Sequence, residues 1–279
     1  MLTDKLGLGE IAGTHGELNV WGEIIDPGGQ VGSGMVEIAD QLILGGAQAA
    51  SGVLNISGGS VLAAQVIAGQ GIGALGTIGV TGGTFGSPTV TLGGTVGATG
   101  ELSVSGGSFA ATTLAVGPSG HGSIAVSGGT FAAQDVTVGN PNESNAVGSL
   151  TLSGGTTDIS GELVLSGAGE AQSITNNATL NVSGNALVNL SGSTIVGLRD
   201  QAVSGNGIGA INMYEGSLIA SNVIAGQGIG AFGTIGISGG SFQADSLTLG
   251  SGGNAAGSVT QTGGDVFFKN LPCLTRRVH

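Results

Sequence analysis

Residues 66–85 read VIAGQGIGALGTIGVTGGTF, and residues 223–242, which begin 157 positions later, read VIAGQGIGAFGTIGISGGSF. The two stretches are almost identical, and looser copies of the same phrase lie between and around them. Self-similarity at a short period is typical of a repeat protein, in which each unit stacks on its neighbours. The fold therefore depends on the repeat more than on any single residue.

The repeating unit opens with a small residue, usually glycine, and the common step between openings is 22–26 residues. Within a unit, apolar residues alternate with small or polar ones, as at Leu102 and Val104 in the front half and Leu114 and Val116 in the back half. A period of two predicts β-strands with one buried face. The openings are Gly16, Gly52, Gly76, Gly100, Gly122, Gly148, Asn177, Gly209, Gly233 and Gly257.

One unit cannot fold by itself. It carries five or six apolar side chains, worth about 1.5–3 kcal/mol each when buried, whereas ordering each backbone residue costs about 1–2 kcal/mol. Stacked units share one core and pair their backbone groups with the next unit. We therefore expect an all-β, single-chain parallel β-helix, a β-solenoid of about ten coils of about 24 residues that spans residues 1–268. A right-handed winding is favoured because parallel crossovers are overwhelmingly right-handed.

Stacked coils place equivalent residues above one another, and the sequence predicts such columns. Phenylalanine recurs after a Gly-Gly pair, a small residue recurs two positions later, and Gly-Gly marks a corner where a positive φ is expected. An antiparallel barrel or sandwich also has short strands punctuated by glycine, but it explains these columns poorly. The members are Phe85, Phe109, Phe131 and Phe242; Ala63, Ser87, Ala111, Ala133, Ala220 and Ala244; and the glycine pairs at 58–59, 82–83, 106–107, 128–129, 154–155, 239–240 and 263–264.

The composition is glycine-rich and acidic, with 60 glycines, 17 acidic and 5 basic side chains among 279 residues and a formal net charge of −12. Three of the basic residues, Lys269, Arg276 and Arg277, fall in the last eleven positions. Binding to phosphate needs a basic surface, so neither nucleic acid nor an anionic membrane is expected as a partner. Glycine and serine interrupt the apolar stretches every few residues, so we expect no signal peptide and no membrane-spanning segment.

The two ends of the sequence depart from the repeat. Residues 4–9 resemble the back half of the unit at 245–250, so we expect the chain to open in mid-coil. Residues 269–279 form a basic tail of different composition, either a cap or a segment that is not native to the array. The single cysteine, Cys273, lies in this tail, so stability must come from stacking rather than from disulfides.

The phrase Gly-x-Leu-x-Val-Ser-Gly-Gly-x-Phe-x-Ala-x-x-Leu-x-Val-Gly, as at 100–117 and 233–250, resembles the glycine-rich repeat of bacterial autotransporter passengers and PEP-CTERM-associated exported proteins. The resemblance covers most of residues 4–268. It implies a right-handed β-helical stalk, often adhesive, that is extracellular or at the outer-membrane surface of a bacterium as part of a longer exported protein. Residues 23–36 and 166–177 depart from the phrase and are expected to form surface loops.

An enzyme is the first alternative, because many β-helix proteins cleave acidic polysaccharides. A lyase needs basic residues, which the body of this chain almost lacks, whereas a hydrolase could use carboxylates at a fixed separation. Asp135, Asp158 and Glu162 are the best such cluster, although solvation of an outer corner explains them as well. His15 and His121 precede unit openings and are expected to be equivalent turn residues. We expect no catalytic residue, no metal site and no cofactor.

A binding surface is the second alternative. The outward residues of the front strands are small and uncharged, and Trp21 and Tyr214 are aromatic residues at positions that are serine or threonine in other units. Such aromatics could stack on sugar, and asparagines could bind its hydroxyls, so Trp21, Tyr214, Asn55, Asn181 and Asn212 are the expected ligand-binding residues. A regular threonine array, as ice binding would need, is absent from the outward column, which reads Asn19, Asn55, Gly79, Ser103, Ala125, Thr151, Asn181, Asn212, Gly236 and Thr260.

These observations together predict a non-catalytic stalk or adhesin segment of a secreted or cell-surface protein. A carbohydrate-active β-helix enzyme and a glycan-binding surface stay open as alternatives. The expected partners are glycans or a host or neighbouring cell surface. Lateral or end-to-end self-association is a further expectation, since the exposed edge strands of an open solenoid invite pairing.

Overall fold

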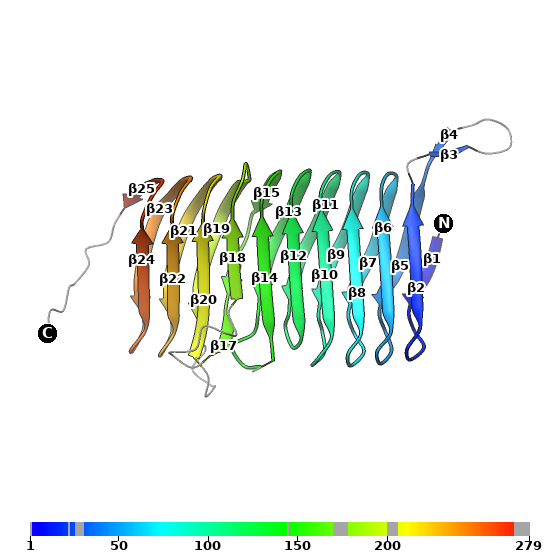
Figure 1. Ribbon diagram of the computed structural model, residues 1–279, viewed down its shortest axis with the longest axis horizontal. Helices are drawn as coiled ribbons and strands as arrows, with labels where there is room; N and C mark the ends of the chain where they lie inside the picture. The colour runs from blue at the N-terminus through cyan, green and yellow to red at the C-terminus, as the bar shows by residue number, and fades with distance from the viewer. Residues whose placement is uncertain are drawn as a thin grey trace, which may run out of the picture.

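The protein was analysed as a computed structural model, which describes residues 2–21, 23–25, 31–143, 145–169, 178–199 and 206–270. Within these residues the regular structure is all β, and the strands stack along one axis with β1 and β25 at opposite ends (Figure 1). In that part of the chain, no helix is long and apolar enough to cross a membrane. The solenoid expected from the repeat is confirmed.

Two long sheets form the walls of the solenoid. The 12-stranded sheet contains, in spatial order, β1 (Leu2–Leu8), β5 (Met35–Leu44), β7 (Ser60–Ala68), β9 (Thr84–Leu92), β11 (Ser108–Val116), β13 (Thr130–Val138), β15 (Thr156–Ile159), β19 (Leu187–Leu198), β21 (Ser217–Gln227), β23 (Ser241–Ser251) and β25 (Asp265–Asn270), with β16 (Leu163–Leu165) between β13 and β19. The 11-stranded sheet contains β2 (His15–Val20), β6 (Ser51–Ile56), β8 (Leu75–Val80), β10 (Thr99–Val104), β12 (His121–Val126), β14 (Val147–Leu152), β18 (Ala178–Val182), β20 (Asn206–Met213), β22 (Phe232–Ile237) and β24 (Ala256–Gln261), with β17 (Gly167–Gly169) beside β20.

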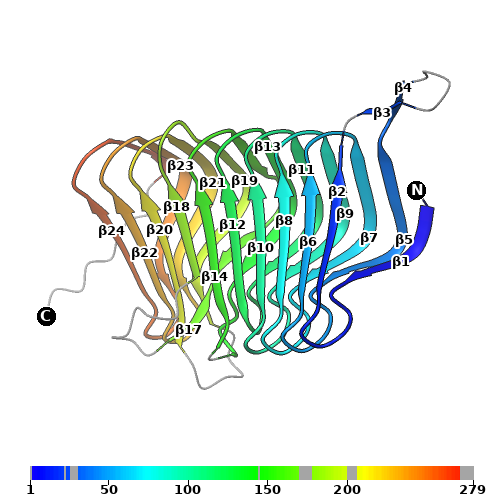
Figure 2. The same cartoon turned by 45° about the vertical axis from the view of Figure 1, so that its right-hand side comes forward.

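Successive coils pair in parallel and in register, so equivalent residues of the repeat lie side by side. Leu102 of β10, for example, pairs with Ile78 of β8 and Ile124 of β12. Among the described pairings, only β17 with β20 and the hairpin of β3 (Glu23–Ile25) and β4 (Val31–Ser33) are antiparallel. Figure 2 shows this hairpin standing away from the coils at the β1 end.

The core is one continuous column system between the two sheets. The phenylalanine column is confirmed: Phe85, Phe109 and Phe131 pair in register, are almost fully buried, and place their ring centroids 5.6 and 5.0 Å apart. Thr157 takes the next place in this column and is also buried. The small-residue column is also buried, except at Ala111, which is partly buried, and Ile38, Ile159 and Leu190 extend it in other coils.

The Gly-Gly corners need two glycines for two different reasons. The second glycine has the expected positive φ, 64° at Gly107 for example. The first does not, but a Cβ on Gly106 would lie 2.4 Å from the carbonyl oxygen of Thr81 in the preceding coil. The first glycine is therefore required by close backbone approach between coils, and the second by its conformation.

One expected unit opening is wrong by one residue. Thr179 pairs with Ser149, and Ala178 pairs with Gly209, so Ala178 and not Asn177 occupies the column of opening glycines. The reason is that an alanine methyl replaces the usual glycine at this position, which hides the marker in the sequence. Asn177 itself lies outside the described residues, as do 26–30 and 170–177 of the expected loops.

The start of the expected tail continues the solenoid. Strand β25 runs to Asn270, which pairs with Ser246, and the Lys269 ammonium lies 3.8 Å from the Asp245 carboxylate. Residues 271–279, with Cys273, Arg276 and Arg277, lie outside the described part of the chain.

Candidate ligand-binding face

The outer face of the 11-stranded sheet carries the residues that the sequence marked for binding. The outward column from Asn19 to Thr260 is confirmed, because each member pairs in register with the next along the sheet. A second outward column, two residues earlier in each strand, runs Glu17, Val53, Thr77, Glu101, Ser123, Ser149, Thr179, Ala210, Thr234 and Ser258. Hydroxyl and amide groups predominate on this face.

The asparagines of the column form two hydrogen-bonded pairs. Asn55 Nδ2 donates to Asn19 Oδ1 at 2.9 Å, and Asn212 Nδ2 donates to Asn181 Oδ1 at 3.0 Å. In both pairs the donor nitrogen points back toward the preceding coil, so the carboxamide oxygen of Asn55 or Asn212 faces the following coil. A glycine stands there in each case, Gly79 after Asn55 and Gly236 after Asn212.

The chain's single tryptophan and single tyrosine flank these pairs. Trp21 follows Asn19 by two residues and is 70% exposed, and Tyr214 follows Asn212 by two residues and is 52% exposed. Residues two apart in a strand project from the same face. Tyr214 follows the end of β20 and lines one groove with Asn212, which bonds Asn181 of β18. Trp21 follows the end of β2, the strand that pairs with β6 and its Asn55.

A shallow groove of about 160 Å³ lies beside Tyr214. It exists because Gly236 leaves a gap in the outward column between Asn212 and Thr260. Its lining includes Asn212, Tyr214, Gly236, Ser238, Thr260 and Thr262. A Cβ built on Gly236 would lie 3.7 Å from Asn212 Oδ1, so this acceptor is directed over the floor of the groove.

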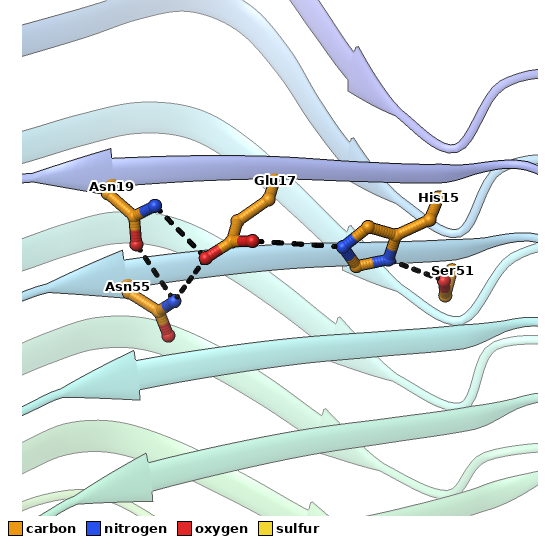
Figure 3. Close-up of polar contacts among 5 residues, drawn as sticks. All are labelled: His15, Glu17, Asn19, Ser51 and Asn55. Carbon is orange, nitrogen blue, oxygen red and sulfur yellow. Dashed lines mark hydrogen bonds and ion pairs between the residues drawn. The ribbon is translucent and has the colours of Figure 1, made fainter.

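A polar network occupies the same face at the β2 end (Figure 3). Glu17 Oε1 accepts hydrogen bonds from the carboxamides of Asn19 at 3.0 Å and Asn55 at 3.1 Å. His15 Nδ1 lies 2.8 Å from Ser51 Oγ, and His15 Nε2 lies 3.8 Å from Glu17 Oε2. The residues come from β2 and β6, whose parallel register places Ser51 beside His15.

Serine, histidine and glutamate are the residue types of a hydrolase triad, but this arrangement does not have the geometry of one. The histidine and glutamate side chains are 56% and 45% exposed, and their 3.8 Å separation exceeds a hydrogen bond. In a triad the carboxylate is buried and bonds the imidazole directly. What the network can do is hold the asparagine carboxamides in one orientation.

Two of the three acidic side chains considered for hydrolysis accept hydrogen bonds from neighbouring coils. Asp135 Oδ1 accepts from the backbone amide of Glu162 at 2.8 Å, in the break between β15 and β16. Asp158 Oδ1 accepts from Asn189 Nδ2 at 3.0 Å across adjacent strands. Neither this groove nor the larger one described below is lined by any of the three acids.

The two histidines expected in turns are equivalent, since His15 and His121 lie in one column through Ser51, Leu75 and Thr99. The expected turn position is wrong, because each is the first residue of a strand, β2 and β12, and pairs there with the next coil. Among the described residues, no group of three or more histidine, cysteine, aspartate or glutamate side chains could hold a metal ion.

Reasoning from sequence missed a larger groove, of about 480 Å³, on the 12-stranded sheet. It lies over the bend in the strands, where Leu62, Gly86 and Ala110 are outward neighbours in register and Leu62 is 42% exposed. The sequence did contain a sign of this groove: Gly86 and Ala110, which lie between the phenylalanine and small-residue columns, have little or no side chain to fill it.

Comparison with protein-family models, curated proteins and solved structures gave no match for this chain.

Proposed function

We propose that this chain is a non-catalytic structural segment of a secreted or cell-surface bacterial protein, a rigid stalk whose outer face makes adhesive contacts. The observation that carries the proposal is the unbroken stack of parallel coils, with ten strands in register on the path of the 11-stranded sheet. The glycine-rich phrase, which resembles that of exported passengers, supports the location.

Rigidity follows from how the coils are joined. Each strand inside the two sheets bonds to a strand on either side, and one cluster of buried side chains extends from Val20 to Leu247. Bending the rod would separate registered strands and open that core, since close-packed interiors do not deform continuously. Ten rungs at about 4.8 Å each give a length on the order of 50 Å.

The outer wall suits contact with an uncharged surface. Serine, threonine and asparagine supply donors and acceptors along the 11-stranded sheet, while Glu17 and Glu101 are the acidic members of its two outward columns. A basic partner or a phosphate-bearing one would find little complementary charge there.

A glycan-array screen of the purified chain, followed by a cleavage assay on every glycan that binds, tests the proposal. Binding without turnover is the expected result for an adhesive stalk. Release of reducing ends from a bound glycan would contradict the non-catalytic assignment. Small-angle X-ray scattering should give the cross-section and length of a single rod, and a flexible-chain profile would contradict the mechanical role.

A further inference from the structure

We propose that the groove beside Tyr214 binds one ring of a neutral sugar. The inference rests on the proposed adhesive function and names its ligand class and site. The groove volume of about 160 Å³ is below the range for drug-sized ligands, which starts at about 300 Å³, and it suits a single ring lying on the sheet.

The chemistry of the lining matches the two faces of a pyranose. An aromatic ring carries partial negative charge on its face, which attracts the C–H bonds on the apolar side of a sugar ring. Tyr214, 52% exposed, offers such a ring at the edge of the groove. Asn212 Oδ1 accepts over the floor, and the hydroxyls of Thr260 and Thr262 can donate or accept around it. Ser238 Oγ donates to the Met213 carbonyl oxygen at 3.2 Å and is left as an acceptor.

The charge distribution selects a neutral sugar over an acidic one. The lining of the groove contains no charged side chain. Glu215, exposed and next to Tyr214 in sequence, would repel a uronate or a sulfated sugar, as would the chain's formal net charge of −12.

The orientation of the asparagine acceptor is fixed before a ligand arrives. Asn212 Nδ2 is already committed to Asn181 Oδ1 at 3.0 Å, so the carboxamide cannot flip without losing that bond. A pre-oriented acceptor lowers the entropy cost of binding. Asn55 and Gly79 repeat this arrangement on β6 and β8, but Ser57 stands where Tyr214 stands, so the chain supplies its own counterpart without the aromatic ring.

The test measures binding of neutral tetrasaccharides of glucose, mannose, galactose and N-acetylglucosamine by isothermal titration calorimetry. Tyr214→Ala should weaken the best binder about tenfold or more, and Tyr214→Phe should stay within about threefold because the ring face remains. Gly236→Thr should abolish binding, since its Cβ has room at 3.7 Å from Asn212 Oδ1 yet its side chain fills the groove.

Gly79→Thr is the matched control, because it adds the same side chain to the same column six strands away, and it should leave binding unchanged. Thermal melts of each variant establish that the fold is intact. Unchanged affinity in folded Gly236→Thr, loss of binding in Trp21→Ala alone, preference for polyuronate, or no affinity for any of the four sugars would each overturn the proposal. If a sugar whose binding depends on Gly236 were cleaved, the proposal of a non-catalytic stalk would be wrong, whereas the proposed sugar site would be supported.

Discussion

Thr194 is the one polar member of an inner column that is otherwise aliphatic where it is described. It pairs between Leu163 and Val223 and is fully buried, and its hydroxyl has no hydrogen-bond partner. A buried unsatisfied polar atom costs about 1–3 kcal/mol. Thr194→Val keeps the shape and removes that atom.

We therefore expect Thr194→Val to raise the free energy of unfolding by about 1 kcal/mol, measured by urea denaturation. Thr157→Val is a comparison at another buried threonine for which no unsatisfied atom is found, and it should gain less. A loss of stability in Thr194→Val would show that the hydroxyl is satisfied in solution, by water for example.

Ala49 has a φ of 53° at a loop position where Gly13, Gly73 and Gly97 stand in neighbouring coils. A non-glycine residue in this region carries a strain of about 1–2 kcal/mol, partly offset by the larger unfolded-state entropy of glycine. Ala49→Gly should therefore raise the melting temperature. Gly73→Ala should lower it, because a Cβ there meets no atom within 4 Å and the backbone conformation alone is penalised.

The melting temperatures of Ala49→Gly and Gly73→Ala should shift in opposite directions, although the two shifts need not be equal in size. If Gly73→Ala were neutral, the positive φ would not limit which residue this loop accepts. The glycine content of the loops would then need another explanation.

Phe109 is fully buried between two other phenylalanine rings, with the Phe131 ring stacked at an interplanar angle of 11°. Removing it leaves a cavity between coils that cannot collapse without breaking register. Phe109→Ala should cost about 3–5 kcal/mol of unfolding free energy. Phe267→Ala, at a residue 61% exposed, is the control and should be nearly neutral. A negligible loss at Phe109 would contradict the register of the whole column.

At the scale of elements, the short strands β15 and β16 show how one coil departs from the repeat. They replace a single bent strand and leave a break at residues 160–162, where Asp135 of β13 accepts a hydrogen bond from the Glu162 amide. Asp135→Ala should cost about 1 kcal/mol and speed hydrogen exchange at the Glu162 amide. Asp135→Asn keeps an acceptor oxygen and should retain most of the protection. Equal exchange in both variants would mean that solvent already satisfies this amide.

The strands, their register and the columns could be predicted from the sequence because each of these features recurs in many copies of the repeat. Phe85, Phe109 and Phe131 could be aligned without a structure, and so could the column from Asn19 to Thr260. Where a coil is irregular, the averaging fails: Ala178 replaces the opening glycine and the marker was misplaced at Asn177. The break around Glu162 likewise has no copy elsewhere to reveal it.

The candidate site was predictable in its members but not in its arrangement. Trp21 and Tyr214 were identifiable as rare aromatics at a position that is serine or threonine in other units. That Asn212 donates toward Asn181 and leaves its oxygen over Gly236 depends on side-chain orientation, which no pattern encodes. The acidic residues gave the same result, since Asp135 and Asp158 could be selected from the sequence but their partners, the Glu162 amide and Asn189, could not.

In the whole molecule, the stability of each coil depends on the coils stacked against it. An interior coil bonds to two others, whereas a coil at either end of the described stack bonds to one. The difference is visible in burial: apart from Ala111, the inward residues of β8 to β13 are almost fully buried, whereas Val259, Val266 and Phe268 in β24 and β25 are only partly so. In a one-dimensional array, opening then starts at the ends and moves inward.

Hydrogen exchange followed by mass spectrometry should therefore show protection that rises from both ends of the solenoid toward β8 to β13. Phe109→Ala, in the middle, should lower protection in the coils on either side of β11 more than at β24, because the cavity weakens two inter-coil interfaces at once. Thr194→Val should act locally in the opposite direction. Uniform protection along the chain, or a central substitution that lowers protection equally everywhere, would mean that the rod opens as one cooperative unit, and nearest-neighbour stacking would not be the source of its stability.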